Sequence, residues 1–141
     1  MPTRKASAVW EGGLKGGKGT FKGETGLGGA YNFGSRFENG TGSNPEQLLA
    51  AAEAACYSMA SSGALEKNGT PPTSVETNAA CTVEKVGDGF TITKMALTVN
   101  AKVPGIARDA FDKIAAATKE GCPVSRALKG VDIQLQANLT P

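Results

Sequence analysis

The sequence NPEQLLAAAEAACYSMASSGALEK, residues 44–67, decides the fold of this chain. Asn44 can cap a helix, the proline after it suits the first helical position, and Gln47 completes a box-like Asn-x-x-Gln arrangement. Most of the remaining residues are good helix formers. An Asn-Gly pair and two prolines within residues 68–72 prevent the helix from continuing. We therefore predict a long, mostly apolar helix over residues 46–67 that is buried in the core.

The segments on either side of this helix read mainly as strands. Residues 75–83 alternate in the manner of a strand, and Gly87-Asp88-Gly89 predicts a hairpin turn after them. The other expected elements are strands at 6–10, 20–22, 90–103 and 131–139, helices at 107–119 and 122–128, and a loop that runs from the second strand to Ser43. Together these elements predict an α+β fold with two substantial helices and antiparallel strands.

The composition excludes several classes of function. A length of 141 residues suits one domain, residues 1–141, and a net charge of +2 with scattered lysines argues against nucleic-acid binding. There is no histidine, and the three cysteines form no CxxC pair, so histidine-based catalysis and a metal site are not expected. Residues 1–10 do not resemble a secretory leader and no apolar run approaches the length of a membrane span, so we expect neither. We expect a cytoplasmic protein in a reducing compartment, without a membrane partner.

One glycine-rich segment imitates a nucleotide-binding motif. Residues 12–19 read GGLKGGKG, close to the phosphate-binding pattern G-x-x-x-x-G-K-[ST]. The last position is Gly19, so the hydroxyl group that binds magnesium in that motif is missing. The required strand–loop–helix context is missing as well. We interpret the segment as a flexible hairpin turn.

The three cysteines differ in their local setting. Cys81 lies on the apolar side of an alternating strand, as a packed core residue would. Cys56 lies in the middle of the long helix, where the helix dipole does not help to ionise its thiol, and it also suits a small core position. Cys122 stands between a glycine and a proline near a helix N-terminus, whose amide groups favour an anion. Local chemistry therefore favours Cys122 as the reactive thiol but does not settle the order of the two.

Four segments carry a resemblance to a known family: residues 35–40 (SRFENG), 41–49 (TGSNPEQLL), 54–56 (AAC) and 121–128 (GCPVSRAL). They resemble the OsmC/Ohr family, the osmotically inducible proteins and the organic hydroperoxide resistance proteins. The Arg-Phe-Glu segment looks closer to the OsmC branch. The resemblance implies an intertwined homodimer, with antiparallel sheets around two long central helices.

The resemblance also implies a thiol peroxidase and assigns roles to four residues. Cys56 takes the place of the cysteine that attacks the peroxide and Cys122 that of the resolving cysteine. Arg36 takes the place of the active-site arginine and Glu46 that of its acidic partner. Without the resemblance, these two charged residues would be interpreted as ordinary surface charges.

The implied reaction begins with a sulfenic acid on Cys56, which Cys122 converts into a disulfide. A dithiol, for which a lipoyl-type molecule is one candidate, then reduces the disulfide by exchange. The implied substrates are organic hydroperoxides and hydrogen peroxide, in defence against oxidative or osmotic stress. No cofactor and no metal are expected.

The positions of Glu46 and Cys56 bear on where this chemistry takes place. Ten residues separate them, which is about 15 Å along one straight helix. Two copies of the helix that cross antiparallel about residue 51 would bring Glu46 of one chain to Cys56 of the other. Alanines at 50, 51 and 52 permit a close crossing. We therefore predict two composite active sites at a dimer interface.

Tyr31, Phe33 and Phe37 flank Arg36 and suit either an apolar substrate entrance or contacts in the core or the dimer.

Two other classes of function remain open from the sequence. A redox-sensing or thiol-binding dimer would become oxidised without efficient turnover. A structural dimer would carry inert cysteines.

Overall fold

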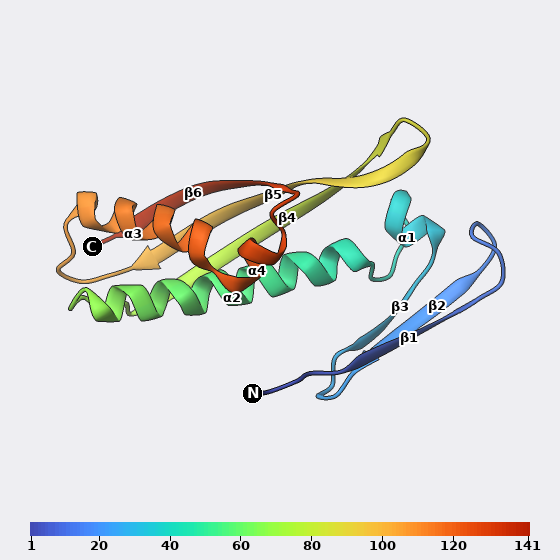
Figure 1. Cartoon of the computed structure of the whole chain (residues 1–141), viewed down its shortest axis with the longest axis horizontal. Helices are drawn as coiled ribbons and strands as arrows, with labels where there is room; N and C mark the ends of the chain where they lie inside the picture. Colours follow the sequence, from blue (N-terminus) through green and yellow to red (C-terminus); the bar gives the residue numbers. More distant parts are fainter. The chain divides into compact units, whose positions relative to one another are not determined.

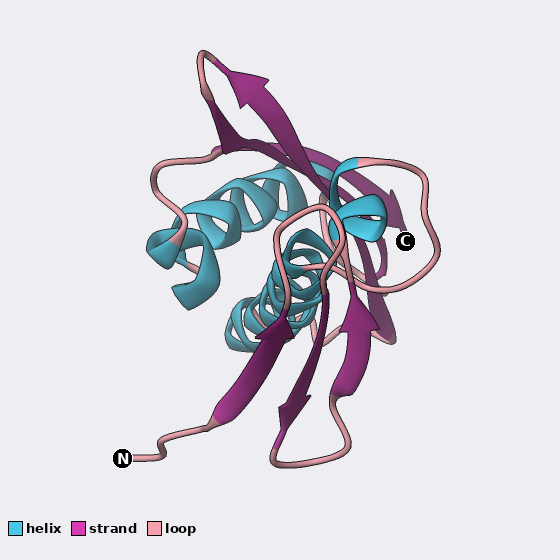
Figure 2. Cartoon of the chain, turned by 90° about the vertical axis from the view of Figure 1, so that its right-hand side faces the viewer, coloured by secondary structure: helices cyan, strands magenta, loops and turns pink.

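A computed structural model describes residues 1–141, which separate into two compact units, Met1–Gln47 and Leu48–Pro141. Figure 1 labels their helices and strands, and Figure 2 distinguishes helices, strands and loops by colour. Each unit contains its own three-stranded sheet. The interpretation of the whole chain as one domain stays a prediction.

The first unit is built on an antiparallel sheet in the order β1-β2-β3. Its strands are β1 (Ala6–Glu11), β2 (Lys18–Gly23) and β3 (Gly28–Tyr31). Glu11 pairs with Lys18, so the glycine-rich residues between them form a hairpin turn, as predicted. Gly12 has a φ of 91°, a left-handed conformation that glycine adopts at little cost.

The expected loop between the second strand and Ser43 is wrong in part, because it contains β3 and a short helix, α1 (Phe33–Phe37). Two glycines in β3 weaken the strand signal, since glycine is depleted in strands. Helix α1 has only 5 residues and is held by a capping box. The Asn32 Oδ1 atom accepts the Ser35 N–H at 2.8 Å, and the Ser35 Oγ atom accepts the Asn32 N–H at 2.9 Å. This local pairing positions the neighbouring residue, Arg36.

The long helix α2 runs from Pro45 to Lys67, close to the predicted bounds. The Asn44 side chain accepts the Gln47 N–H at 2.8 Å, as the capping motif predicts. The expected burial in the core is found on one face of the helix in the single chain, and another face is exposed. The buried face repeats every four residues, with Glu53, Tyr57, Ser61 and Leu65. The exposed face carries Ala51, Ala52, Ala55 and Met59. Small apolar residues occupy much of the helix, so the sequence alone did not distinguish its faces.

The second unit places α2 and two further helices against one face of a mixed sheet (Figures 1 and 2). The strands are β4 (Ser74–Val86), β5 (Gly89–Lys102) and β6 (Asp132–Thr140), and the helices are α3 (Arg108–Gly121) and α4 (Pro123–Ala127). Alternate residues of β5 face the helices, and the buried ones are Met95, Leu97, Val99 and Ala101. Tyr57 packs against the first three, and Leu65 and Phe111 pack against Ala101.

The pairing of β6 corrects the expectation of antiparallel strands. β4 and β5 form the predicted antiparallel hairpin, closed by the Val86–Gly89 pair. β6 pairs parallel to β5, from Lys94–Asp132 to Lys102–Thr140. A parallel partner requires a crossover connection, and α3 and α4 supply it. The α+β class is confirmed, and the crossover brings α4 beside the middle of α2. None of the helices has the length and apolar character needed to cross a membrane.

Candidate active site

The second unit brings together two cysteines that lie 66 residues apart in the chain. Cys56 comes from the middle of α2, and Cys122 lies at the junction of α3 and α4. The Cys122 thiol donates to the Cys56 sulfur, with 2.6 Å between the two Sγ atoms. Neither cysteine is in a disulfide, and a disulfide bond measures about 2.0 Å. The two thiols are therefore close enough to be joined by oxidation.

The junction that holds Cys122 also serves Cys56. Helix α3 ends where the Cys122 N–H donates to the Thr118 carbonyl at 2.9 Å, and Pro123 occupies the first turn of α4. The first amides of a helix have no partner within it. One of them, the Val124 N–H, hydrogen-bonds the Cys56 sulfur and acts to lower the pKa of that thiol. The sequence suggested that the N-terminus of this helix would favour a thiolate on Cys122. In the structure one of its amides instead hydrogen-bonds the sulfur of Cys56.

The second unit nevertheless raises the pKa of the Cys56 thiol above its usual value. Burial is the largest cause, and the hydrogen bond with Cys122 adds to it. The Val124 amide opposes them, while the charges of Cys122 and Glu53 raise the pKa further. Negative charge and burial both disfavour a thiolate. A reactive Cys56 therefore needs a cation that these neighbours do not provide.

Two residues at this site were missed in the sequence. Glu53 is fully buried, and its Oε1 atom accepts a short hydrogen bond from the Ser125 hydroxyl in α4. Its other carboxylate oxygen, Oε2, is buried without a hydrogen-bond partner. The signal available was one acidic residue in an apolar run, three residues before Cys56. On a helix that spacing places both side chains on the same face.

The first unit brings together Arg36 and Glu46. The Nε and Nη2 atoms of Arg36 lie 3.1 and 2.9 Å from the Glu46 Oε1 atom. Glu46 is 5% exposed, and its Oε2 atom is buried without a partner. Backbone carbonyls hold the pair in place, since Ser35 Oγ donates to the Ser43 carbonyl and Asn44 Nδ2 to the Ser35 carbonyl, both at 2.8 Å. The guanidinium is therefore oriented by a carboxylate that retains one unused oxygen.

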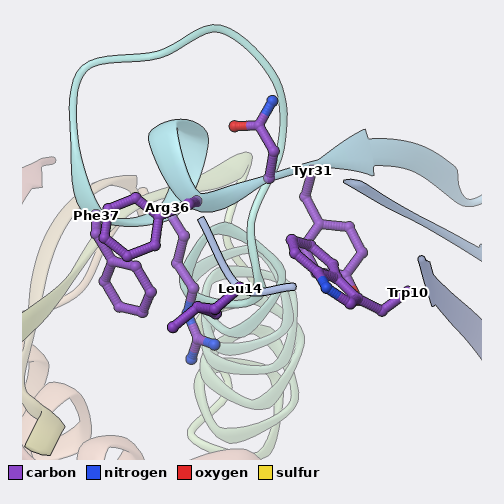
Figure 3. Close-up of a pocket in the computed structure, with 7 residues that line it drawn as sticks. Trp10, Leu14, Tyr31, Arg36 and Phe37 are labelled. Carbon is purple, nitrogen blue, oxygen red and sulfur yellow. The ribbon is translucent and has the colours of Figure 1, made fainter. Parts of the chain in front are cut away.

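A cavity of about 250 Å³ lies beside Arg36 (Figure 3). Its walls include the predicted aromatic residues Tyr31, Phe33 and Phe37. The Arg36 guanidinium lies 5.0 Å from the centre of the Phe37 ring, a cation–π arrangement. Trp10 and Leu14 complete the apolar wall and were missed, because one lies in a predicted strand and the other in a turn interpreted as flexible. The cavity offers an apolar surface next to a cation.

A family model described as OsmC-like protein matches residues 38–136. The chain belongs to the OsmC family. Peroxiredoxin OsmC of Escherichia coli strain K12 is 47% identical to it over 139 residues, 95% of this chain and 97% of that protein. Organic hydroperoxide resistance protein OhrB of Bacillus subtilis strain 168 is 36% identical over 101 residues, 70% of this chain and 72% of that protein. The difference in identity and coverage favours the OsmC branch.

Solved structures support the same family fold. The OhrB structure from Bacillus subtilis superposes with a TM-score of 0.70 at 26% identity, covering 95% of this chain and 98% of that one. An OsmC-like protein from Mycoplasma pneumoniae gives a TM-score of 0.76 at 14% identity, covering 99% of both chains. At that identity the second likeness concerns the fold alone. The OsmC fold is thus retained across large differences in sequence.

Proposed function

We propose that this chain reduces hydroperoxides with Cys56 as the attacking thiol and Cys122 as the resolving thiol. It is a cysteine-based peroxidase of the OsmC family, and relatives are named a peroxiredoxin and an organic hydroperoxide resistance protein. The observation that carries the proposal is the 2.6 Å approach of the Cys56 and Cys122 sulfurs. A hydroperoxide and a thiol reductant are its two reaction partners.

The proposed reaction has three steps. The Cys56 thiolate attacks the terminal peroxide oxygen, the O–O bond breaks, and the departing alkoxide takes up a proton to become an alcohol. Cys122 then attacks the sulfenic sulfur, and water leaves as the disulfide forms. A dithiol, for which a lipoyl-type molecule is our candidate, exchanges with the disulfide and restores both thiols.

Arg36 and Glu46 would act on the first step. Arg36 would stabilise the thiolate and the negative charge that develops on the departing oxygen, and Glu46 would orient Arg36. Within one α2 helix, Glu46 and Cys56 are separated by about 15 Å of axial rise. We therefore propose a homodimer in which the Arg36–Glu46 pair of one chain serves Cys56 of the other. The exposed small residues Ala51, Ala52 and Ala55 support a close crossing of two α2 helices.

The raised pKa of Cys56 gives a test of this role for Arg36. Because burial disfavours the thiolate, alkylation of Cys56 in an Arg36→Ala variant should become fast only in the alkaline range. In the unaltered protein the guanidinium should move the pH midpoint of alkylation down by about two units. The measurement is the rate of iodoacetamide labelling at Cys56 against pH, followed by peptide mass analysis.

The matched control is Arg108→Ala, which removes an exposed arginine paired with Asp112. Its midpoint should equal that of the unaltered protein. An unaltered protein that labels at the same alkaline pH as the Arg36→Ala variant would contradict the role given to Arg36.

The cavity beside Arg36 supports a preference for organic hydroperoxides over hydrogen peroxide. Leu14 lines the cavity and is 61% exposed, so truncating it should affect substrate contacts more than folding. In Leu14→Ala, kcat/KM for a bulky organic hydroperoxide should fall by about tenfold, the scale of lost apolar contacts. The value for hydrogen peroxide should not change. Steady-state kinetics with several peroxides and several dithiols measures both.

Val9→Ala is the control for that experiment, because Val9 is 59% exposed on β1 and does not line the cavity. Equal losses with both peroxides would mean that the cavity does not select the substrate. The same kinetics separate a peroxidase from a redox-sensing dimer, which would consume about one peroxide per subunit and then stop. A cytoplasmic location and a role in oxidative or osmotic stress stay predictions.

A further inference from the structure

The proposed reaction makes no use of the most deeply buried charged side chain near the thiols. Glu53 has no exposed surface, and only one of its two carboxylate oxygens has a hydrogen-bond partner. Burying a carboxylate without full hydrogen bonding is costly. The other five residues from 50 to 55 are all alanines, so the helix itself does not require a carboxylate here. The position therefore calls for a role beyond packing.

Glu53 is part of a paired arrangement between two helical segments. On α2, Glu53 lies three residues before Cys56, and on the facing segment Cys122 lies three residues before Ser125. The two thiols form one link between the segments, and the Ser125 hydroxyl with Glu53 Oε1 forms the other. Val124, next to Ser125, donates its N–H to the Cys56 sulfur. The Glu53 carboxylate is thus hydrogen-bonded to α4 immediately beside the two sulfurs.

Helix α4 has few other means of keeping this position. It has only 5 residues and no side-chain cap at its N-terminus. Short helices have little stability of their own and depend on tertiary contacts. Leu128, at its C-terminal end, packs against the core cluster around Tyr57. Besides the Val124 N–H to the Cys56 sulfur, the bond from Ser125 to Glu53 is a polar contact that joins the middle of α4 to α2, and it is the one made between side chains.

We propose that Glu53 is a positioning residue for the resolving step: through Ser125 it holds α4 so that Cys122 stays in line with the Cys56 sulfur. The inference rests on the proposed peroxidase function. In that step the Cys122 sulfur bonds to the Cys56 sulfur and the S–O bond breaks. The oxygen leaves as hydroxide and combines with the Cys122 thiol proton to give water. Cys122 is thereby oxidised and the Cys56 sulfenic acid is reduced.

Positioning matters here because the sulfenic acid has a competing fate. A second peroxide converts it to a sulfinic acid, which does not return to the cycle by thiol exchange. The slower Cys122 attacks, the larger the share of Cys56 that is lost in this way. Glu53 therefore sets how much peroxide the enzyme can reduce before Cys56 is lost as sulfinic acid, although Glu53 does not contact the peroxide.

The charge of Glu53 does not account for its presence. A carboxylate beside Cys56 opposes the thiolate that the first step needs, and it contributes to the raised pKa of that thiol. Glu53→Gln separates the two effects, because the amide oxygen can still accept the Ser125 hydroxyl while the charge is removed. A role that depends on the hydrogen bond and a role that depends on the charge therefore predict different results for this variant.

The test measures products by intact mass after stepwise addition of cumene hydroperoxide, together with the single-turnover rate of disulfide formation. In Glu53→Ala and Ser125→Ala, disulfide formation should slow by about tenfold or more, the scale of losing a hydrogen bond to a charged group. Sulfinic acid should appear at a correspondingly lower dose of peroxide. The double variant should be no slower than the slower single variant, because both changes remove one contact.

Glu53→Gln should divide the Cys56 sulfenic acid between disulfide and sulfinic acid in the same proportion as the unaltered protein, which we call the partition. Its Cys56 should be alkylated at lower pH, because the opposing charge is gone. This variant and Ser125→Ala also keep the proposal testable should Glu53→Ala fail to fold. Glu53→Gln that forms sulfinic acid as readily as Glu53→Ala would overturn the positioning role in favour of the charge. Unchanged partition in both Glu53→Ala and Ser125→Ala would overturn it as well.

Tyr57→Phe is the matched structural control. Burial raises the pKa of Tyr57 to about 12, so its hydroxyl stays protonated and donates to the Ala115 carbonyl at 2.8 Å, joining α2 to α3. Removing that buried bond should lower stability and leave the partition unchanged. A shift in partition equal to that of Ser125→Ala would reduce Glu53 to a structural residue. Unaltered protein that forms neither sulfenic acid nor disulfide would refute the peroxidase proposal instead.

Discussion

Replacing Cys56 with serine should abolish peroxide turnover, with a loss of at least about a thousandfold in kcat/KM. A serine hydroxyl is a far weaker nucleophile than a thiolate, and no other thiol occupies the position next to Cys122. The measurement is dithiol-dependent consumption of an organic hydroperoxide by the purified full chain. Retained turnover in this variant would refute the assignment of Cys56 as the attacking thiol.

Two companion variants make the result specific. Cys122→Ser should still consume about one peroxide per subunit, because Cys56 can be oxidised once and then has no resolving partner. Cys81→Ser should keep full turnover, since Cys81 lies in β4 and packs against the core cluster around Tyr57. Reversed behaviour of Cys56→Ser and Cys122→Ser would assign the attack to Cys122, the thiol that local sequence chemistry favoured.

Mixing two inactive variants should restore activity if the sites are composite. Glu46→Gln removes the carboxylate that orients Arg36 and should lower kcat/KM by about 10²- to 10³-fold. Cys56→Ser is inactive for a different reason. In a dimer with one copy of each, one site would combine an intact Cys56 with an intact Glu46 from the other chain. An equal mixture, unfolded and refolded together, should therefore recover about a quarter of the unaltered activity.

The control for this experiment pairs Cys56→Ser with Cys122→Ser. Both cysteines that form the proposed disulfide come from one chain, so that mixture should recover no steady-state turnover. If the mixture of Glu46→Gln with Cys56→Ser stays inactive, then Arg36, Glu46 and Cys56 of the same chain form one site. The experiment thus tests the composite site without depending on a structure of the dimer.

The fold followed from the sequence wherever signals were local. The caps and stops around residues 44–72 gave the bounds of α2 closely, and the Gly87-Asp88-Gly89 turn gave the β4–β5 hairpin. β3 and α1 were missed because glycines weaken the first and five residues are too few to show a helical period in the second. The parallel pairing of β6 depends on a crossover, which no local signal specifies.

Only part of the candidate site could likewise be predicted from the sequence. Its motifs pointed to Cys56, Cys122, Arg36 and Glu46, whose roles remain to be tested. Glu53 was passed over because a glutamate in a helix is usually solvated, and only the packing of α4 reveals its burial. The Val124 amide could not be assigned either, because its acceptor lies on another helix. Contacts between elements, rather than residue types, carried the missing information.

The distance in sequence between the two thiols has a consequence for the whole second unit. Oxidation would close a covalent ring of more than 60 residues that contains the β4–β5 hairpin and all of α3. In the chain-entropy view, restricting the unfolded chain to a ring of that size contributes about 4 kcal/mol. The oxidised enzyme would then be the form that best withstands heat and proteolysis. Reduction would make it reactive again and at the same time easier to unfold, so oxidised enzyme would be protected until its reductant arrives.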